Sequence, residues 1–240
     1  PYVFRDEADG KFLMVLCAVG HTRVFAAEVE MQAGVNANSL HDYAAAEARF
    51  KRGQRIAPWD DAFPRRLGQV YMVTMRFDRA IQSLDESIAL NRYYILTYLS
   101  LAQARMYVAQ QALLEQPRDT AKALARLDAA TSDLDALLRI CPMFPAAHEM
   151  YGRIASIEAL AVSDLHDPSR VDEAKAYWAR AAEHLTEARK YNIENKGESS
   201  LALAKVYMAL SENRRAEREL TAAMQYDPME TEAASALVDL

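Results

Sequence analysis

The residues that could carry chemistry in this sequence are few and scattered. The histidines, the usual acids and bases near neutral pH, stand singly at His21, His41, His148, His166 and His184. His148 precedes Glu149, but this pair could ligate a metal only with help from elsewhere in the chain, so we expect an ordinary surface role for His148. The sequence contains no glycine-rich phosphate loop, no G-x-S-x-G and no H-E-x-x-H. We therefore predict no catalytic residues, no metal and no cofactor.

Two smaller groups of reactive side chains point the same way. Asp164, His166 and Asp167 gather just before Pro168, a composition typical of a turn rather than of a metal site. Cys17 and Cys141 lie far apart in the sequence, which favours neither a disulfide framework nor a metal knuckle.

The composition favours a helical protein. The 240 residues are 51% apolar and include only 7 glycines, while alanine is abundant. The formal net charge of −6 argues against a nucleic-acid binder. One basic cluster can be read either as a solvated helix face or as a contact for an acidic peptide; it contains Arg49, Lys51, Arg52, Arg55, Arg65 and Arg66.

The stretch from Asp61 to Tyr94 shows how the helices would be arranged. Leu67-Gly68 is followed three residues later by Tyr71, and the next helix then carries Phe77, Ala80, Leu84 and Ser87. Gly68 and Ala80 are small where two antiparallel helices would cross, and Leu84 fills the space around that crossing. This pattern resembles the tetratricopeptide repeat, which has a period of about 34 residues. One such hairpin cannot bury its apolar face alone, so others must stack on it.

The resemblance implies an all-α, right-handed solenoid of five helical hairpins with a C-terminal capping helix. Stepping by about 34 residues from Asp61 places Gly34 and Phe50 where Gly68 and Leu84 stand. The predicted repeats are 27–60, 61–94, 95–144, 145–196 and 197–230, followed by a terminal helix over 231–240. Residues 1–26 form a leader or a non-repeat extension.

Two adjacent repeats, 95–144 and 145–196, are about 16 and 18 residues longer than the period. Their extra residues fall at the hairpin turns marked by Pro117 and Pro168, so both helices of each pair are lengthened. We expect the two extensions to protrude as one lobe and to bury each other's apolar residues: Val108, Ala112, Leu113, Leu124 and Leu127 in the first, and Leu160, Leu165, Val171, Ala174 and Tyr177 in the second.

The N-terminal segment leaves three readings open. Lys11 precedes the apolar run Phe12–Val19, with small residues further on, which is the layout of an export signal. Alternatively, Tyr2–Arg5 and Lys11–Val19 flank a turn signal and form a β-hairpin with a third strand at Thr22–Val24, or the segment is an additional helix. The run is too short to span a bilayer. The chain is periplasmic if residues 11–26 are a signal, and cytoplasmic otherwise.

The resemblance also implies a concave groove lined by the first helix of each pair. It assigns to this groove Arg65, Arg66, Gln69, Met72, Gln103, Met106, Glu149, Arg153, Lys205 and Met208, with Glu28, Met31, Gln32 and Asn38 at the N-terminal end. The methionines either accommodate apolar side chains of a peptide or fill gaps between helices. Trp59 and Trp178 are interpreted as packing residues.

The function that follows is a non-catalytic scaffold or adaptor that binds a protein or peptide in the groove. Two alternatives stay open. The chain could be a regulatory or substrate-docking part of a larger enzyme, or, if the leader is real, an exported factor for envelope or secretion assembly. The sequence predicts neither the partner nor the oligomeric state.

Overall fold

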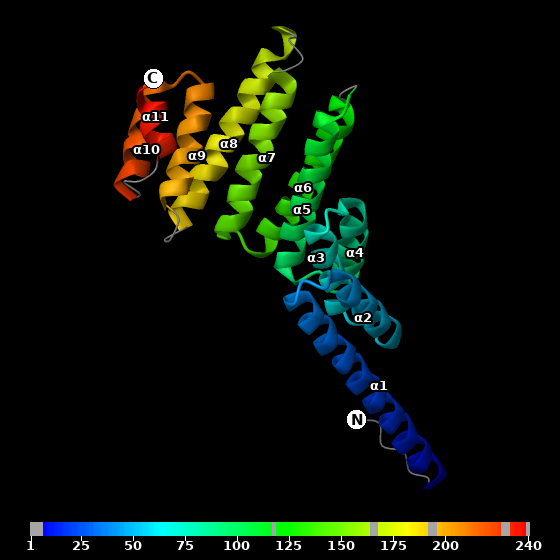
Figure 1. Cartoon of the computed structure of the whole chain (residues 1–240). Coiled ribbons are helices and arrows are strands. Elements are labelled where there is room, and N and C mark those ends of the chain that lie inside the picture. The colour runs from blue at the N-terminus through cyan, green and yellow to red at the C-terminus, as the bar shows by residue number, and fades with distance from the viewer. Residues whose placement is uncertain (1–6, 117–118, 164–167, 192–195, 227–230, 239–240) are drawn as a thin grey trace. The chain divides into compact units, whose positions relative to one another are not determined.

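The structure, a computed structural model, describes residues 7–116, 119–163, 168–191, 196–226 and 231–238, with side chains described from residue 20 onward except at position 21. All regular structure in these residues is helical, with eleven α-helices, one short 3-10 helix and no strand (Figure 1). The predicted all-α class is therefore confirmed. The chain divides into two compact units, Pro1–Thr97 and Tyr98–Leu240.

The first unit is built from antiparallel helices joined by short turns. It contains α1 (Glu7–Ser39), α2 (Tyr43–Ile56), α3 (Ala62–Val73), α4 (Phe77–Leu90) and the first residues of α5 (Ile95–Leu114). Helix α1 packs on α2, α2 on α3, and α3 on α4. Asp42 caps the N-terminus of α2 by accepting a hydrogen bond from the backbone N–H of Ala45 at 3.0 Å.

The glycines of this unit let the helices approach closely. A Cβ atom built on Gly68 would lie 2.6 Å from Cγ of Leu84, and one on Gly34 would lie 2.4 Å from the ring of Phe50. The predicted crossings of small and large residues are therefore confirmed. A third close approach joins α2 to α3, because a Cβ on Gly53 would lie 2.0 Å from the ring of Phe63.

Three turns between paired helices hold a residue in the left-handed backbone region. His41, Met75 and Ser211 have φ of 61°, 57° and 60°. Each lies in the turn between the two helices of a pair, and residues with a side chain adopt this conformation at a cost.

The second unit contains the longer helices. It comprises the rest of α5, followed by α6 (Thr120–Ile140), α7 (Pro145–Ser163), the 3-10 helix η1 (Pro168–Arg170), α8 (Val171–Tyr191), α9 (Lys196–Ala209), α10 (Asn213–Tyr226) and α11 (Thr231–Val238). Helices α5 to α8 have 20, 21, 19 and 21 residues, against 14 in α9 and α10. The two longer hairpins are thus present, and we keep the repeat boundaries themselves as a proposal.

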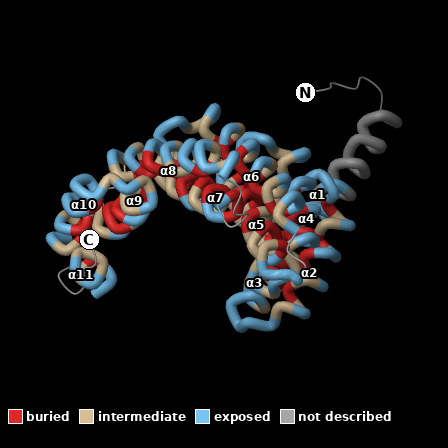
Figure 2. Tube along the Cα trace, turned by 90° about the horizontal axis from the view of Figure 1, so that it is seen from above, coloured by how far each residue is buried: buried red, intermediate tan, exposed pale blue. Residues whose placement is uncertain are grey.

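Burial in the second unit follows the inward faces of the paired helices (Figure 2). Leu127, Leu134, Ile154 and Leu203 are fully buried. The small residue Gly152 again marks a crossing, since a Cβ there would lie 2.6 Å from Cγ of Leu185. Helix α11 packs on α10, and its Ala233 joins a buried cluster with residues of α9 and α10.

The added parts of the longer hairpins are only partly buried. Val108, Ala112 and Ala174 are buried as expected, and Leu165 lies outside the described residues. Leu160 and Val171, however, remain 54% and 49% exposed. The expectation that every apolar residue of the extensions is buried is therefore wrong for these two side chains.

The N-terminal segment is helical over the residues that the structure describes. Helix α1 runs continuously from Glu7 to Ser39, so the proposed strands at Lys11–Val19 and Thr22–Val24 are wrong, and Tyr2–Arg5 lies outside the described residues. None of the helices in the described part has both the length and the apolar content that a membrane crossing requires.

Candidate partner-binding groove

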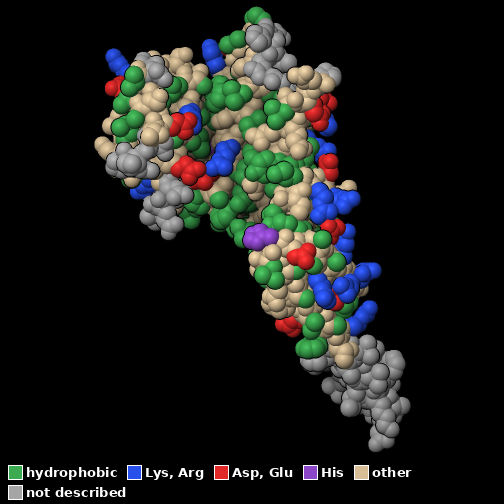
Figure 3. All heavy atoms as spheres, viewed as in Figure 1, with side chains coloured by type: hydrophobic (Ala, Val, Ile, Leu, Met, Phe, Trp, Pro, Cys, Tyr) green, Lys and Arg blue, Asp and Glu red, His purple; other side chains and the backbone are tan. Residues whose placement is uncertain are grey.

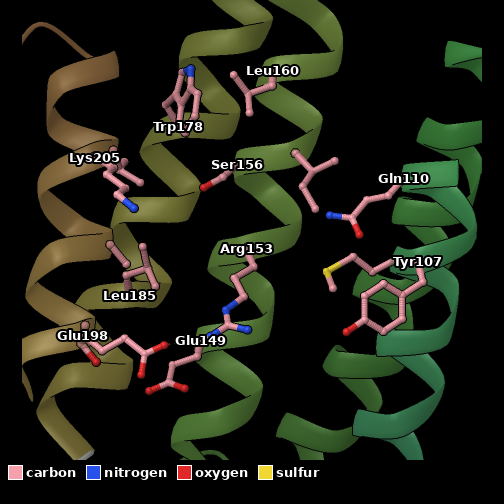
Figure 4. A pocket seen from close by; sticks show the side chains of 15 residues that line it. Tyr107, Gln110, Glu149, Arg153, Ser156, Leu160, Trp178, Leu185, Glu198 and Lys205 are labelled. Carbon is pink, nitrogen blue, oxygen red and sulfur yellow. Dashed lines mark hydrogen bonds and ion pairs between the residues drawn. The ribbon is translucent and has the colours of Figure 1, made fainter. Parts of the chain in front are cut away.

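The first helices of the pairs in the second unit line a hollow with a volume of about 570 Å³. This volume lies within the range of about 300–1,000 Å³ that is typical of ligand sites. Figure 3 shows hydrophobic side chains gathered in the hollow, and Figure 4 shows the side chains around it. We call it the α5–α7–α9 groove. It is lined by Met106, Tyr107 and Gln110 of α5, Glu149, Arg153, Ser156, Ile157 and Leu160 of α7, Trp178 and Leu185 of α8, and Glu198, Ser199, Ala202, Lys205 and Val206 of α9.

The packing of α8 against α7 and α9 supports the wall of the groove. Leu185 is 4% exposed and packs into the crossing at Gly152, in a buried cluster that includes Leu203 and Val206 of α9. Trp178 packs against the same cluster and also lines the groove. These side chains are therefore held by the core of the unit, which keeps the apolar wall in place without a ligand.

Glu149, Arg153 and Glu198 lie toward one end of the groove, and Lys205 lies farther along it, near Trp178 (Figure 4). Arg153 Nη2 lies 3.3 Å from Glu198 Oε1, and in Figure 4 the Arg153 guanidinium lies beside the carboxylates of Glu149 and Glu198. Lys205 Nζ lies 2.6 Å from Glu232 Oε1. The four side chains of these two ion pairs are all more than half exposed. Such pairs contribute little to stability, on the order of 0.2–1 kcal/mol, so they can exchange for a partner's charges.

Most of the groove residues assigned in the second unit meet in this hollow. Met106, Glu149, Arg153 and Lys205 line it. Gln103 lies one turn before Tyr107 and donates a hydrogen bond from Nε2 to the Tyr107 hydroxyl at 3.3 Å. The half-buried Met208 is not among the lining residues.

The groove is also lined by seven apolar side chains that the assignment from sequence omitted: Tyr107, Ile157, Leu160, Trp178, Leu185, Ala202 and Val206. Tyr107 and Ile157 occupy the last groove position of their proposed repeats, so the spacing could have identified them. Leu160 lies in the part of α7 that exists only because this hairpin is longer, and Trp178 belongs to a second helix. Position counting within a standard repeat could have found neither of these two.

Four of the eight groove residues assigned in the first unit, Glu28, Met31, Arg65 and Arg66, line a separate hollow of about 460 Å³, which Trp59 also lines. Trp59 is 57% exposed, so its interpretation as a packing residue is wrong. Four other assigned residues lie elsewhere on this unit: Gln32, which donates a hydrogen bond to Asn36, the exposed Asn38 and Gln69, and the half-buried Met72.

The two arginines of that hollow are held differently. Arg65 Nε lies 3.6 Å from Asp61 Oδ2, and its guanidinium stacks over the ring of Tyr94 at 4.0 Å from the centroid. Arg66 donates a hydrogen bond to the neighbouring Gln69, at 3.1 Å. Arg65 therefore supports the fold of the first unit in addition to any contact with a partner.

Much of the basic cluster is paired within the first unit. Arg49 and Arg52 lie 3.3 and 4.0 Å from the same oxygen of Glu30. Lys51, Tyr71 and Arg76 all donate hydrogen bonds to Glu47, at 2.6, 2.9 and 2.8 Å. These contacts favour the reading of the cluster as a helix face rather than as a peptide contact.

These hydrogen bonds set the protonation state of Glu47. Burial raises the pKa of the Glu47 carboxyl, but the bonds from Lys51, Arg76 and Tyr71 outweigh it and lower the pKa to about 2. The carboxylate therefore stays charged and ties α2 to α3 and to the start of α4.

The expectation of a surface role for His148 is wrong. Its side chain is buried at 8% exposure, with Nε2 at 2.9 Å from the carbonyl oxygen of Pro142 and Nδ1 at 3.1 Å from Nδ1 of His184. Since a carbonyl only accepts, His148 Nε2–H donates to Pro142, and His184 Nδ1–H donates to His148. Burial and the neighbouring His148 lower the pKa of His184 to about 4, so the His184 ring is neutral near pH 7.

This histidine pair is part of a polar interface between α7 and α8. The His184 ring stacks on Tyr151 at 3.8 Å between centroids, and Arg180 forms an ion pair with the buried Glu158. The contacts hold the longer hairpin together and give the histidines a structural role. The predicted turn cluster of Asp164, His166 and Asp167 lies outside the described residues.

Comparison with known proteins identifies the architecture. No family model matches the sequence and no curated protein is similar to it. Among solved structures, a MamA chain from Desulfovibrio magneticus RS-1 matches over 85% of this chain and 97% of its own, with a TM-score of 0.64 and 12% identity. TTC0263, described as a thermophilic TPR protein in Thermus thermophilus, matches over 89% of this chain and 98% of its own, with a TM-score of 0.57 and 20% identity. The chain has the tetratricopeptide-repeat (TPR) fold.

A third TPR structure gives the same result. YrrB, described as a TPR protein with an unusual peptide-binding site, matches over 86% of this chain and 89% of its own, with a TM-score of 0.60 and 13% identity. At these identities the likeness concerns the TPR fold and leaves the partner of this chain to be argued from its own residues.

Proposed function

We propose that this TPR-fold chain is a non-catalytic interaction scaffold that holds a segment of a partner protein in the α5–α7–α9 groove. The observation that carries this proposal is the convergence of the partly exposed Ile157, Leu160 and Trp178, together with the buried Met106, in one hollow. Large apolar side chains that remain accessible in a preformed groove are typical of a protein-binding surface.

The surrounding charges suit such a binding site. Arg153 and Lys205 stand at the groove with exposed carboxylate partners, so a bound segment could exchange these ion pairs at low cost. The known TPR structure of YrrB, described as having a peptide-binding site, supports the same use of this fold. In the first unit we keep Arg66, Gln69 and Met72 as a proposed second contact.

A displayed library of random peptides would test the proposal. Peptides selected on the wild-type chain should bind the Leu160→Asp variant at least about tenfold more weakly, because a carboxylate would be placed among apolar contacts at the centre of the interface. Leu160 is 54% exposed, so the change should leave folding intact.

The matched control is Leu114→Asp. Leu114 lies in the same unit, is 82% exposed and does not line the groove, so this variant carries the same change in charge and hydrophobicity. If the selected peptides bind the two variants equally well, the groove is not the binding site.

A further inference from the structure

The wall of the α5–α7–α9 groove offers few hydrogen bonds to a peptide backbone. Ile157, Leu160 and Trp178 are apolar, the Ser156 hydroxyl donates to the carbonyl oxygen of Gly152 at 2.9 Å within its own helix, and the Tyr107 hydroxyl accepts a hydrogen bond from Gln103. Among the neutral polar side chains of the lining, this leaves Gln110 and Ser199 to bond a peptide backbone. An extended segment pressed against such a wall would leave backbone N–H and C=O groups without partners, each at a cost of about 1–3 kcal/mol. A helical segment satisfies these groups internally.

The dimensions of the apolar wall also suit a helix. Arg153 and Leu160 both face the groove and are separated by about two turns of α7, or roughly 10 Å. Tyr107 of α5 and Trp178 of α8 lie at the same hollow (Figure 4). Apolar side chains at positions i, i+3, i+4 and i+7 of a partner helix would cover this distance.

The net charge of the second unit indicates the sign of the partner's charge. Residues 98–240 contain 16 Lys and Arg against 22 Asp and Glu, so the whole formal net charge of −6 lies in this unit, whereas residues 1–97 are balanced at 12 each. At the groove, Glu149, Glu198 and Glu232 outnumber Arg153 and Lys205. The field at the groove therefore favours a cationic partner.

We propose that the α5–α7–α9 groove binds an amphipathic α-helix whose apolar face is flanked by lysine or arginine. This inference rests on the proposed function and specifies the partner's conformation and charge. The apolar stripe lies against Ile157, Leu160 and Trp178, and the basic residues pair with Glu149 and Glu198, displacing Arg153 from its exposed ion pair.

Three synthetic peptides of about 16 residues, roughly four helical turns, would test the inference. The first has leucine on one face and is flanked by lysine, the second replaces each lysine by glutamate, and the third keeps lysine but carries two central prolines that prevent a helix. Binding is measured by calorimetry on the full chain. We expect the lysine-flanked helix to bind at least about fivefold more tightly than either of the others.

Two pairs of variants locate the binding. Leu160→Asp should weaken the lysine-flanked peptide about tenfold, and Leu114→Asp should not. Glu198→Arg should weaken it about three- to fivefold and favour the glutamate peptide, whereas Glu183→Arg, an equal change of charge at an exposed position of α8 outside the groove, should change the two peptides' affinities much less.

The outcomes separate this inference from the proposed function. The proposal of a helical, basic partner is overturned by any of three results. The proline peptide binds as tightly as the lysine-flanked helix, the glutamate peptide binds more tightly than it, or none of the three peptides binds. The groove would still stand as a binding site if library peptides depend on Leu160. If library peptides also ignore Leu160→Asp, both proposals fail.

Discussion

Adding one methyl group at Gly68 tests whether the helix crossings are as tight as the structure shows. A glycine in the middle of a helix is ordinarily destabilising by about 0.5–1 kcal/mol relative to alanine, so Gly68→Ala would stabilise an isolated helix. Here the new Cβ would lie 2.6 Å from Cγ and from Cδ2 of Leu84. That is about 1 Å closer than the usual carbon–carbon contact of 3.5–4.0 Å.

The size of the effect follows from the surroundings of Leu84. Its side chain is fully buried, so it cannot move aside into solvent. Overpacking of this kind costs about 1–3 kcal/mol, which exceeds the helix-propensity gain. We therefore expect Gly68→Ala to lower the free energy of unfolding by about 1–2 kcal/mol.

The assay is urea unfolding followed by far-UV circular dichroism, in a double-mutant cycle with Leu84→Ala. Removing Leu84 creates the space that the methyl group needs, so the double variant should be more stable than the sum of the single changes by about 1–2 kcal/mol. Gly20→Ala is the control, because no side chain lies within 4 Å of its new Cβ. A Gly68→Ala protein more stable than the wild type, or an additive cycle, would refute the reasoning.

Three further perturbations concern the polar contacts. Glu47→Gln should lower the free energy of unfolding by about 1–2 kcal/mol at pH 7, since the folded pKa of about 2 lies below the unfolded value of 4.5; the difference from wild type should disappear as the pH falls from 4.5 toward 2 in urea titrations at each pH. His184 has a folded pKa of about 4 against 6.5 unfolded, so its contribution to stability is present above pH 6.5 and is lost as the pH falls toward 4. His184→Gln should therefore remove about 1–2 kcal/mol of the change in unfolding free energy between these pH values. NMR titration of the His184 ring should give a midpoint near 4, and a midpoint near 6.5 would contradict the buried pair. Arg65→Glu should lower stability by about 1–2 kcal/mol, because it loses the stack on Tyr94 and places a carboxylate beside Asp61, whereas Arg66→Glu should have little effect on thermal unfolding; equal effects would show that the Arg65 contacts are unimportant.

The sequence predicted those contacts that recur with the repeat. Gly34 with Phe50 and Gly68 with Leu84 stand at the same spacing, so one pattern located both crossings. The contact between Gly53 and Phe63 joins α2 to α3, and nothing in the pattern of a single hairpin specifies it. The α-helical continuation of α1 was one of three readings, because an acidic turn signal and an acidic first helical turn have the same composition.

The candidate groove was predictable only where standard repeat positions apply. Met106, Arg153 and Lys205 were found by counting, whereas Leu160 and Trp178 depend on how far the longer helices extend. The pairing of His148 with His184 could not be predicted from the sequence either, because the two residues lie on separate helices at a spacing that no motif describes. Such contacts depend on the three-dimensional packing of α7 and α8.

The turn residues with positive φ imply that this fold can be made more stable by substitution at these positions. Replacing His41, Met75 or Ser211 by glycine would relieve backbone strain of about 1 kcal/mol at each position, measurable as a rise in the unfolding midpoint, and none of the three lines the α5–α7–α9 groove. A chain strengthened in this way could tolerate costly substitutions on its binding surface. Stabilising these turns should therefore widen the range of groove substitutions that the fold tolerates.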